Sequence, residues 1–244
     1  MKAAHVYPDP PEDRRAARLA ANLAAVRERI AAACVAAGRW PGDVTLIAVT
    51  KTFPVEDVRR LVALGVTDFG ENRDQEARSK AAAVPGVRWH FVGRLQRNKA
   101  RSVASYADVV HSVDRAELVD TLETASAGVR DHPLTVLVQV NLDADLDPRR
   151  GGVRPVDVPA LADRIAIADH LHLAGVMAVA PLGEQADAAF ARLAEVSARL
   201  RTVHPDAAMV SAGMSGDFEA AVRHGATHTR VGTALLGGRG SLVG

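Results

Sequence analysis

Cysteine is almost missing from this sequence of 244 residues, where Cys34 is the single one. An internal disulfide is therefore impossible, and the chain suits a reducing compartment such as the cytosol. The first eleven residues lack the apolar core of a signal peptide. Apolar runs elsewhere fall far short of the ~20 residues that a membrane-spanning helix needs. These absences predict a cytoplasmic protein that neither enters nor crosses a membrane.

An excess of charge of one sign is missing too. The 30 lysines and arginines balance 29 aspartates and glutamates, which leaves a formal net charge of +1. Because nucleic-acid binding depends on a clustered basic excess, we expect no nucleic-acid partner. Apolar residues make up 48% and charged residues 24%, which is ordinary for a globular protein. The length fits one large α/β domain, since single barrels typically run to ~250 residues.

The beginning of the chain divides into a tail and a helix. Residues 1–11 are rich in proline and predict a loose tail. Glu12–Ala37 contains neither proline nor glycine, and Leu19, Leu23, Val26 and Ile30 recur at helical spacing. Gly38 is a typical helix end. We therefore predict an amphipathic N-terminal helix over residues 12–38.

Beyond this helix, strand-like and helix-like stretches alternate with short connections. This alternation predicts a parallel sheet, and eight repeats favour closure into a barrel. An open, doubly wound sheet is the alternative, but its glycine fingerprint is missing after the first strand. We therefore predict a single (β/α)8 TIM-type barrel with an extra N-terminal helix, forming one domain over residues 1–244. The strand candidates are Val44–Val49, Val66–Phe69, Val87–Val92, Asp108–His111, Leu134–Val140, Leu171–Val179, Ala207–Val210 and Thr227–Val231.

Lys51 ends the first predicted strand, just before Pro54 opens a helix. The carboxyl ends of barrel strands carry the chemistry in this architecture. A lysine held there among apolar walls is desolvated, its pKa falls, and the neutral amine can attack a carbonyl. The alternative is a lysine that extends from the rim and pairs with a carboxylate.

Two further stretches point to an anion site. Ser215 and Gly232 follow the seventh and eighth predicted strands and open helices. Barrels commonly bind phosphate in these loops, because free backbone N–H groups and helix N-termini favour an anion. The alternatives are a plain N-cap at Ser215 and a plain turn at Gly232.

Two polar stretches near the second and third strands allow two interpretations each. Asn72 begins a predicted helix, where its amide could donate to a ligand at the barrel mouth or only cap that helix. The stretch 89–99 runs from a strand into a basic loop. Its spacing alone favours a solvated loop.

A metal site is not expected. Asp143-x-Asp145-x-Asp147 resembles the start of a calcium loop, but Pro148 stands where that loop needs glycine. His170 and His172 face one side of a strand without a third ligand.

Taken together, these stretches resemble one family, the pyridoxal phosphate homeostasis proteins, also called the YggS/PROSC family. The similarity runs from about Val44 to Arg239, in order and with similar spacing. The stretches that carry it are Ala48–Thr52, Phe69–Asn72, Gln75-Glu76, Trp89–Gly93, Leu95-Gln96, Asn98-Lys99, His111–Asp114, Gly213–Ser215 and Arg230–Thr233. The sequence departs from the family pattern at Arg73, where an aromatic residue is common, and at Arg150-Gly151-Gly152, where Lys-x-Gly is usual.

The resemblance implies a barrel like the N-terminal domain of alanine racemase, with pyridoxal 5′-phosphate (PLP) bound as a Schiff base by Lys51. It implies a role in PLP supply without a firmly established catalytic activity. The implied cofactor contacts are the phosphate at Ser215, Gly232 and Thr233, the ring beside Asn72 and His90, and the pyridine nitrogen facing Arg230.

The chemistry of these residues favours binding over catalysis. Arg230 is always protonated and cannot share a proton with the pyridine nitrogen, so the ring is a weakened electron sink. In related racemases a tyrosine from a further C-terminal domain is the second base. Here the only tyrosines are Tyr7, in the tail, and Tyr106, and the sequence ends soon after the eighth strand.

We therefore predict a monomeric carrier or regulator that supplies PLP to apo-enzymes as acceptors. The enzyme alternatives are a slow single-domain racemase with Lys51 as its one base, and a cofactor-free Schiff-base aldolase.

Overall fold

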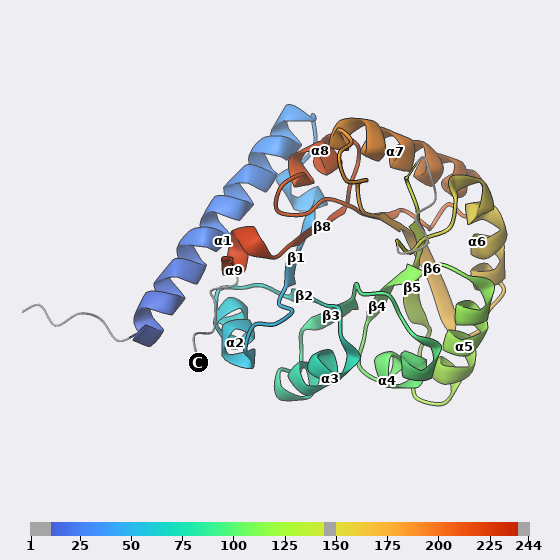
Figure 1. Ribbon diagram of the computed structural model, residues 1–244, viewed down its shortest axis with the longest axis horizontal. Helices are drawn as coiled ribbons and strands as arrows, with labels where there is room; N and C mark the ends of the chain where they lie inside the picture. Colours follow the sequence, from blue (N-terminus) through green and yellow to red (C-terminus); the bar gives the residue numbers. More distant parts are fainter. Residues whose placement is uncertain (1–10, 144–149, 239–244) are drawn as a thin grey trace, which may run out of the picture.

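Eight parallel strands close into a barrel in the described part of the chain, with helices around them (Figure 1). The computed structural model describes residues 11–143 and 150–238. The strand order follows the sequence, and β1 (Thr45–Val49) closes the ring by pairing with β8 (His228–Val231). The predicted fold class, a (β/α)8 barrel with an extra N-terminal helix, is confirmed.

The other strands are β2 (Asp68–Glu71), β3 (Arg88–Phe91), β4 (Val109–Val113), β5 (Leu134–Val140), β6 (Leu171–Ala178) and β7 (Met209–Ser211). The α-helices are α1 (Pro11–Ala36), α2 (Val55–Ala63), α3 (Asp74–Ala83), α4 (Ala100–Ala104), α5 (Ala116–Ala127), α6 (Val158–Ala166), α7 (Ala186–Val203), α8 (Phe218–Arg223) and α9 (Thr233–Leu236). Short 3-10 turns stand at Pro41–Asp43, Arg97–Lys99 and Pro155–Asp157. None of these helices combines the length and the apolar character that crossing a membrane requires.

Helix α1 packs along the outside of the barrel beside α8 and α9, far from them in sequence (Figure 1). Its predicted apolar stripe is buried, and it meets the hydrophobic residues Phe218, Leu235 and Leu236. Polar contacts fix the helix in place: the Asn22 amide donates to the Leu235 carbonyl at 2.9 Å. Each fully buried leucine of this stripe contributes about 1.5–3 kcal/mol relative to exposure. The N-terminal helix is thus an integral layer over the β8–β1 side.

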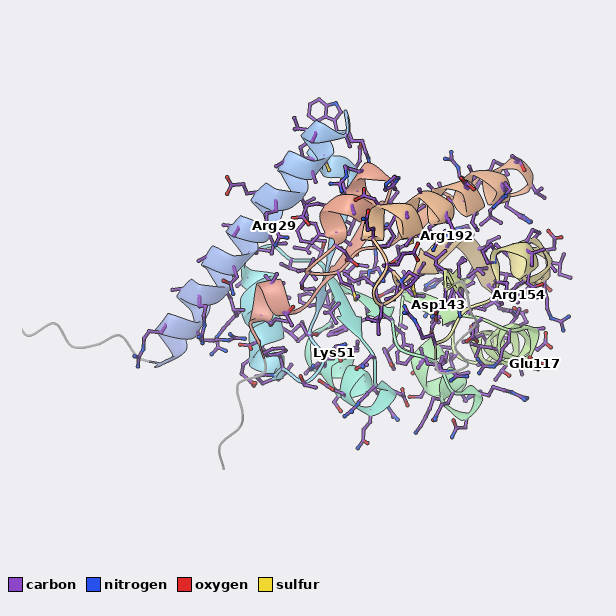
Figure 2. The ribbon with its side chains drawn as sticks, turned by 45° about the horizontal axis from the view of Figure 1, so that its top comes forward. Arg29, Lys51, Glu117, Asp143, Arg154 and Arg192 are labelled. Atoms are coloured by element: carbon purple, nitrogen blue, oxygen red, sulfur yellow. The ribbon has the colours of Figure 1, made fainter. Side chains whose placement is uncertain are left out.

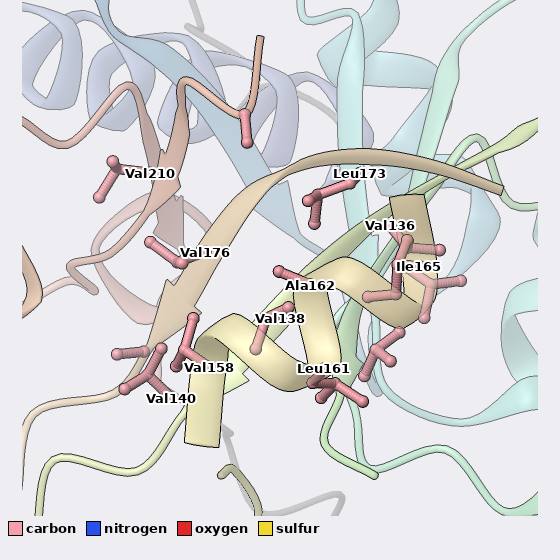
Figure 3. Packing of buried hydrophobic residues seen from close by; sticks show 14 of the residues in the cluster. Val136, Val138, Val140, Val158, Leu161, Ala162, Ile165, Leu173, Val176 and Val210 are labelled. Carbon is pink, nitrogen blue, oxygen red and sulfur yellow. The ribbon is translucent and has the colours of Figure 1, made fainter. Parts of the chain in front are cut away.

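The opposite side of the barrel is held by apolar packing between strands and covering helices. Figure 3 shows α6 lying across β5 and β6, with Val136 beside Ile165 and Val138 and Val176 toward Val158. These β-branched residues suit strands that are buried on both faces, as parallel strands are. This half of the barrel therefore supplies rigidity.

Several element boundaries differ from the sequence prediction by one to three residues, and two of them differ for identifiable reasons. Val66 does not start β2, because its N–H bonds to the Leu61 carbonyl at 3.0 Å and, with Gly65 at φ +77°, closes α2. This is the helix-ending motif in which an apolar residue follows glycine. Helix α3 begins at Asp74, with Arg73 at its N-cap, so Asn72 is not its first residue. Of the predicted tail, residues 1–11, the first ten lie outside the described residues, and Pro11 belongs to α1 instead.

Candidate functional site

A cavity of about 480 Å³ opens at the carboxyl ends of the strands. This volume falls in the range of small-molecule sites. Most of the residues singled out from the sequence line it together. The predicted residues on its wall are Lys51, Asn72, Ser215, Arg230, Gly232 and Thr233, joined by Val49, Val92, Gly93, Met177, Val179, Met214 and Gly216.

Lys51, labelled in Figure 2, is the second residue after β1 and lines this cavity. Its side chain is exposed, which corrects the expectation that apolar walls desolvate it. The next residue, Thr52, has φ +69°, a left-handed conformation that a β-branched residue rarely adopts. The lysine therefore stands on a strained turn, and such turns persist only where surrounding contacts hold them.

A buried ionic cluster behind the strand provides these contacts. The Lys80 ammonium donates to the Thr50 carbonyl at 2.8 Å, to Glu71 Oε1 at 2.7 Å and to Glu76 Oε1 at 2.6 Å. The backbone N–H of Thr52 donates to Glu76 Oε1, also at 2.6 Å. The cluster thus forms hydrogen bonds to the backbone on both sides of Lys51, at the Thr50 carbonyl and the Thr52 N–H. We call Lys80, Glu71 and Glu76 the ionic clamp.

Glu71 is the buried end of the ionic clamp. Burial raises the pKa of its carboxyl above the ordinary value, although hydrogen bonds from Lys80 and Thr50 pull it down. Its Oε2 atom is buried without a hydrogen-bond partner among the described residues. A carboxylate in this position depends on Lys80 for its charge balance.

Asn72 is placed beside the cavity by the close approach of two loops. A Cβ on Gly93 would lie 2.3 Å from the Asn72 carbonyl oxygen, so only glycine fits there. Because Asn72 lies outside α3, its amide is free for the cavity and does not cap that helix. The structure thereby favours the ligand interpretation of this residue.

The loops after β7 and β8 meet at the far wall. Gly213 has φ +85°, and a Cβ there would lie 2.6 Å from Phe218 Cα, so the turn requires glycine. The Ser215 hydroxyl accepts a hydrogen bond from the Ala234 N–H at 3.1 Å, which joins the two loops. Helices α8 and α9 are short, so an anion here would be held by individual N–H and O–H groups.

Arg230 forms the base of the cavity and is 5% exposed. Its guanidinium donates to Ser211 Oγ at 2.7 Å and to the Ala178 carbonyl at 2.8 Å. Burial lowers the pKa of Arg230 to about 10, with Asp217 opposing the shift. The side chain therefore remains a cation at neutral pH.

His90 is the exception among the predicted residues, because it does not line the cavity. It lies deeper in the barrel, where Nε2 is 2.9 Å from Asp68 Oδ1 and Nδ1 is 2.9 Å from His111 Nε2. It also borders a separate opening at the other end of the barrel, together with His228. In the structure His90 thus lies below the wall of the cavity, and its position near a cofactor ring stays a prediction.

A continuous hydrogen-bond chain runs from His90 to Arg230. His111 Nδ1 lies 3.0 Å from Ser211 Oγ, which accepts from Arg230. Because the Asp68 carboxylate can only accept, the directions for neutral imidazoles follow from that end: His90 Nε2–H donates to Asp68, His111 Nε2–H donates to His90, and Ser211 donates to His111. Both imidazoles are neutral in this arrangement. We call Asp68, His90, His111, Ser211 and Arg230 the histidine chain.

The electrostatics of the histidine chain agree with a neutral His111 and an anionic Asp68. Burial, reinforced by His90 and Arg230, holds the pKa of His111 well below its usual value. For Asp68, burial pushes the pKa up, but hydrogen bonds from His90 and Thr67 outweigh it and leave the pKa lowered. The chain therefore separates an anionic end at Asp68 from a cationic end at Arg230.

Sequence reasoning assigned no role to several of these residues. Lys80 lies four residues after Glu76 on α3, a spacing that puts both on one helix face. Asp68 and His111 are polar residues within buried strands, where barrels usually carry apolar ones. The four-residue spacing of Glu76 and Lys80, and the polar residues within buried strands, are the sequence signals that could have indicated these roles.

No group of three or more histidine, cysteine, aspartate or glutamate side chains is arranged for a metal within residues 11–143 and 150–238. His170 instead pairs with Glu123 at 2.7 Å. Asp145 and Asp147 of the calcium-like stretch lie outside the described residues.

Comparisons with known proteins show which family this chain resembles. Residues 16–240 match the family model of the alanine racemase N-terminal domain. A pyridoxal phosphate homeostasis protein of Mycobacterium leprae is 44% identical, over 91% of this chain and 93% of that protein. One from Pseudomonas aeruginosa is also 44% identical, over 91% and 96%.

A solved structure shares the fold as well. PipY of Synechococcus elongatus PCC7942, with PLP bound, superposes with a TM-score of 0.77 and 34% identity, covering 90% of this chain and all of that one. With a barrel of matching fold, a clustered site and relatives of this identity, the chain belongs to the family of pyridoxal phosphate homeostasis proteins.

Proposed function

We propose that this protein binds PLP as a Schiff base through Lys51 and acts in intracellular PLP supply. One observation carries the proposal: the Lys51 amine, the loops after β7 and β8 and the buried Arg230 cation line the same cavity. These are the groups that an aldehyde, a phosphate and a pyridine ring need. Relatives named for PLP homeostasis and a neighbour with PLP bound support it.

Each residue has a distinct role in this proposal. Lys51 supplies the amine for the aldehyde, and the hydroxyls and N–H groups at Ser215, Gly232 and Thr233 receive the phosphate. Asn72 donates to a polar edge of the ring, and Arg230 faces the pyridine nitrogen. Bound PLP would supply an electrophilic carbonyl and a conjugated ring.

The same residues favour supply over turnover. Arg230 remains protonated at neutral pH, since its pKa is about 10, and it has no proton acceptor to offer the ring nitrogen. Among the residues lining the cavity, Lys51 is the only general base for a substrate α carbon. Tyr106 is not on this wall; its hydroxyl is buried without a hydrogen-bond partner in the described part of the chain. A missing general base typically costs ~10²–10⁴-fold in rate.

The cellular setting follows from the same proposal. The acceptors would be apo forms of PLP-dependent enzymes in the cytoplasm. We expect the protein to act as a monomer, with α1 covering part of the barrel surface. A concentration-independent dimer mass in sedimentation would contradict this expectation.

Borohydride trapping tests the covalent link. The protein loaded with PLP should take one pyridoxyl group per chain, on the peptide that contains Lys51. Lys51→Ala should remain folded and lose the absorbance of the linked cofactor, whereas Lys99→Ala should keep both. Recovery of the label on Lys80 or Lys99 would overturn the assignment.

Exchange in D2O then separates supply from catalysis. The loaded protein is incubated with L-alanine and other amino acids, and α-deuteration is followed by NMR. Incorporation at an enzymatic rate of ~1–10³ s⁻¹ would make the chain a racemase-type enzyme. Transfer of PLP to an apo-enzyme without measurable exchange would support supply.

A further inference from the structure

A second cavity, of about 580 Å³, lies beside the cofactor cavity at the same end of the barrel. Asn72 lines both, so the two cavities adjoin at this residue. The second cavity is formed by the start of α3, the loop after β3 and the start of α5. Its place at the rim makes it accessible to any molecule that enters or leaves the cofactor cavity.

The charge of this wall is strongly one-sided. Four cations line it, Arg73, Arg94, Lys99 and Arg115, against the single carboxylate of Asp74. Arg115 pairs with Asp114, and Lys99 lies 3.9 Å from Asp74. No carboxylate pairs with Arg73 or Arg94 within residues 11–143 and 150–238. Because the whole chain carries a net charge of only +1, this concentration of cations is local. We call these four residues the basic rim.

The floor of the cavity is apolar. Phe91 and Leu95 are 3% and 1% exposed, and both line it. Cations above an aromatic and aliphatic floor suit a small molecule that has an anionic group and an apolar body. The volume also falls in the range of small-molecule sites.

The sequence supplies an independent reason to assign this cavity a role. Gln75, Leu95-Gln96 and Lys99 belong to the stretches that carry the family resemblance, yet none lines the cofactor cavity. All of them line the second cavity. The proposed cofactor site therefore leaves these residues without a function.

We propose that the basic rim and its apolar floor form a second, non-covalent binding site for a phosphate monoester. The proposal rests on the proposed function, because the natural occupant would be a phosphorylated pyridine compound on its way into or out of the neighbouring cavity. The phosphate would contact Arg73 and Arg94, and the ring would lie over Phe91. No bond to the protein forms or breaks at this site.

The test uses the full chain after PLP loading and borohydride reduction, so that the first site is blocked. Pyridoxamine 5′-phosphate is then titrated by calorimetry, because it carries the ring and the phosphate but no aldehyde for lysines. We expect one further molecule per chain, with weaker binding at high salt. Inorganic phosphate should compete, and unphosphorylated pyridoxamine should bind at least about tenfold more weakly, since one lost charged hydrogen bond is worth that much.

A matched pair of double variants isolates the site. Arg73→Gln/Arg94→Gln removes two cations of the basic rim, and Arg78→Gln/Arg97→Gln removes two exposed ones that do not line the cavity. Both lower the net charge equally. The first should weaken pyridoxamine 5′-phosphate at least about tenfold, and the second should leave it unchanged.

Three results would overturn the proposal: no saturable binding, equal weakening in both double variants, or saturable binding of a glutamate-rich peptide without binding of the phosphate compounds. Failure of the proposed function is recognised separately, because no pyridoxyl group would then be found on Lys51 by mass spectrometry. In that case inorganic phosphate is titrated on the unloaded protein. Weaker phosphate binding in Arg73→Gln/Arg94→Gln, but not in Arg78→Gln/Arg97→Gln, would still support the second site.

Discussion

Two buried polar networks support the candidate cofactor site, and they do so by different physics. The ionic clamp lies between β2 and α3, where one ammonium meets two carboxylates. The histidine chain lies inside the barrel, where two neutral imidazoles connect Asp68 to Arg230. The clamp fixes a backbone segment, the turn that carries Lys51. The chain fixes a side chain, the Arg230 guanidinium.

The difference follows from where charges can be tolerated. When opposite charges are in contact, as in the clamp, their attraction offsets part of the free energy lost on desolvation. The barrel interior instead keeps its charges at the two ends and fills the space between them with satisfied neutral groups. The clamp should therefore fail by leaving a charge unpaired, and the chain by leaving a hydrogen bond unmade. An unpaired buried charge lowers the free energy of unfolding more than an unmade hydrogen bond does.

The largest expected effect is that of Lys80→Met. It leaves the Glu71 carboxylate buried without its cation, and breaking such a pair typically costs about 3–5 kcal/mol. Urea unfolding at pH 7 should show this loss. Because the pKa of Glu71 is raised and a protonated Glu71 needs no cation, the loss should shrink as the pH is lowered.

Matched variants sharpen this result. Lys99→Met removes an exposed lysine that lies 3.9 Å from Asp74, and it should cost less than about 1 kcal/mol. Adding Glu71→Gln to Lys80→Met should restore part of the stability. Equal losses for the two lysine variants would show that the clamp is an ordinary surface pair.

The second effect is a pH dependence of opposite sign in the two networks. Burial lowers the pKa of His228, beside the chain, to about 4, and it keeps His111 neutral as well. Between pH 6.5 and 4 the unfolded chain then binds more protons, so stability falls as the pH falls. His228 alone contributes roughly 3 kcal/mol to this fall, at 1.36 kcal/mol per pKa unit. The raised pKa of Glu71 acts the other way, because the folded state takes up its proton first.

Unfolding midpoints between pH 7 and 4 would measure this balance. His228→Asn should flatten the fall, whereas His132→Asn, at an exposed position, should leave it unchanged. A fall that is identical in all three proteins would show that the buried imidazoles do not set the pH dependence.

A third effect concerns the middle of the histidine chain. His111→Leu keeps the volume but leaves Ser211 and His90 each without one partner. We expect a loss of about 1–3 kcal/mol in unfolding free energy, the cost of an unsatisfied buried group. Nitrogen-15 NMR of the unmodified protein should show protonated Nε2 and unprotonated Nδ1 on His90 and His111. The opposite tautomer on either ring would contradict the proposed direction of the chain.

The sequence predicted the architecture and most of the site for physical reasons that are local. Apolar, β-branched runs and turn residues mark the strands. Lys51, Ser215 and Gly232 lie within four residues of the ends of their strands, so a barrel brings them to one end. The distance of His90 from the mouth of the barrel could not be predicted. It depends on the stagger between neighbouring strands, which sets the layer of the barrel interior that an inward-facing side chain occupies. The ionic clamp was hidden for a related reason. The sequence pattern of α3 predicts that Lys80 lies on the surface. In the structure, the packing of α3 on β2 buries this lysine against Glu71.

The smallest effect tests whether the clamp stores strain in the turn it holds. Thr52 has φ +69°, and such a conformation costs roughly 1–3 kcal/mol in a residue with a side chain. Thr52→Gly relieves this strain but adds about 0.5–1 kcal/mol of backbone entropy to the unfolded chain. We expect a net gain of up to about 1 kcal/mol in stability, together with slower borohydride-trappable reaction of Lys51 with PLP, because the turn is less restricted. Thr52→Ala keeps the positive φ and should keep the reaction rate. If Thr52→Gly reacts as fast as the unmodified protein, the ionic clamp alone positions Lys51, and the strained turn adds nothing to it.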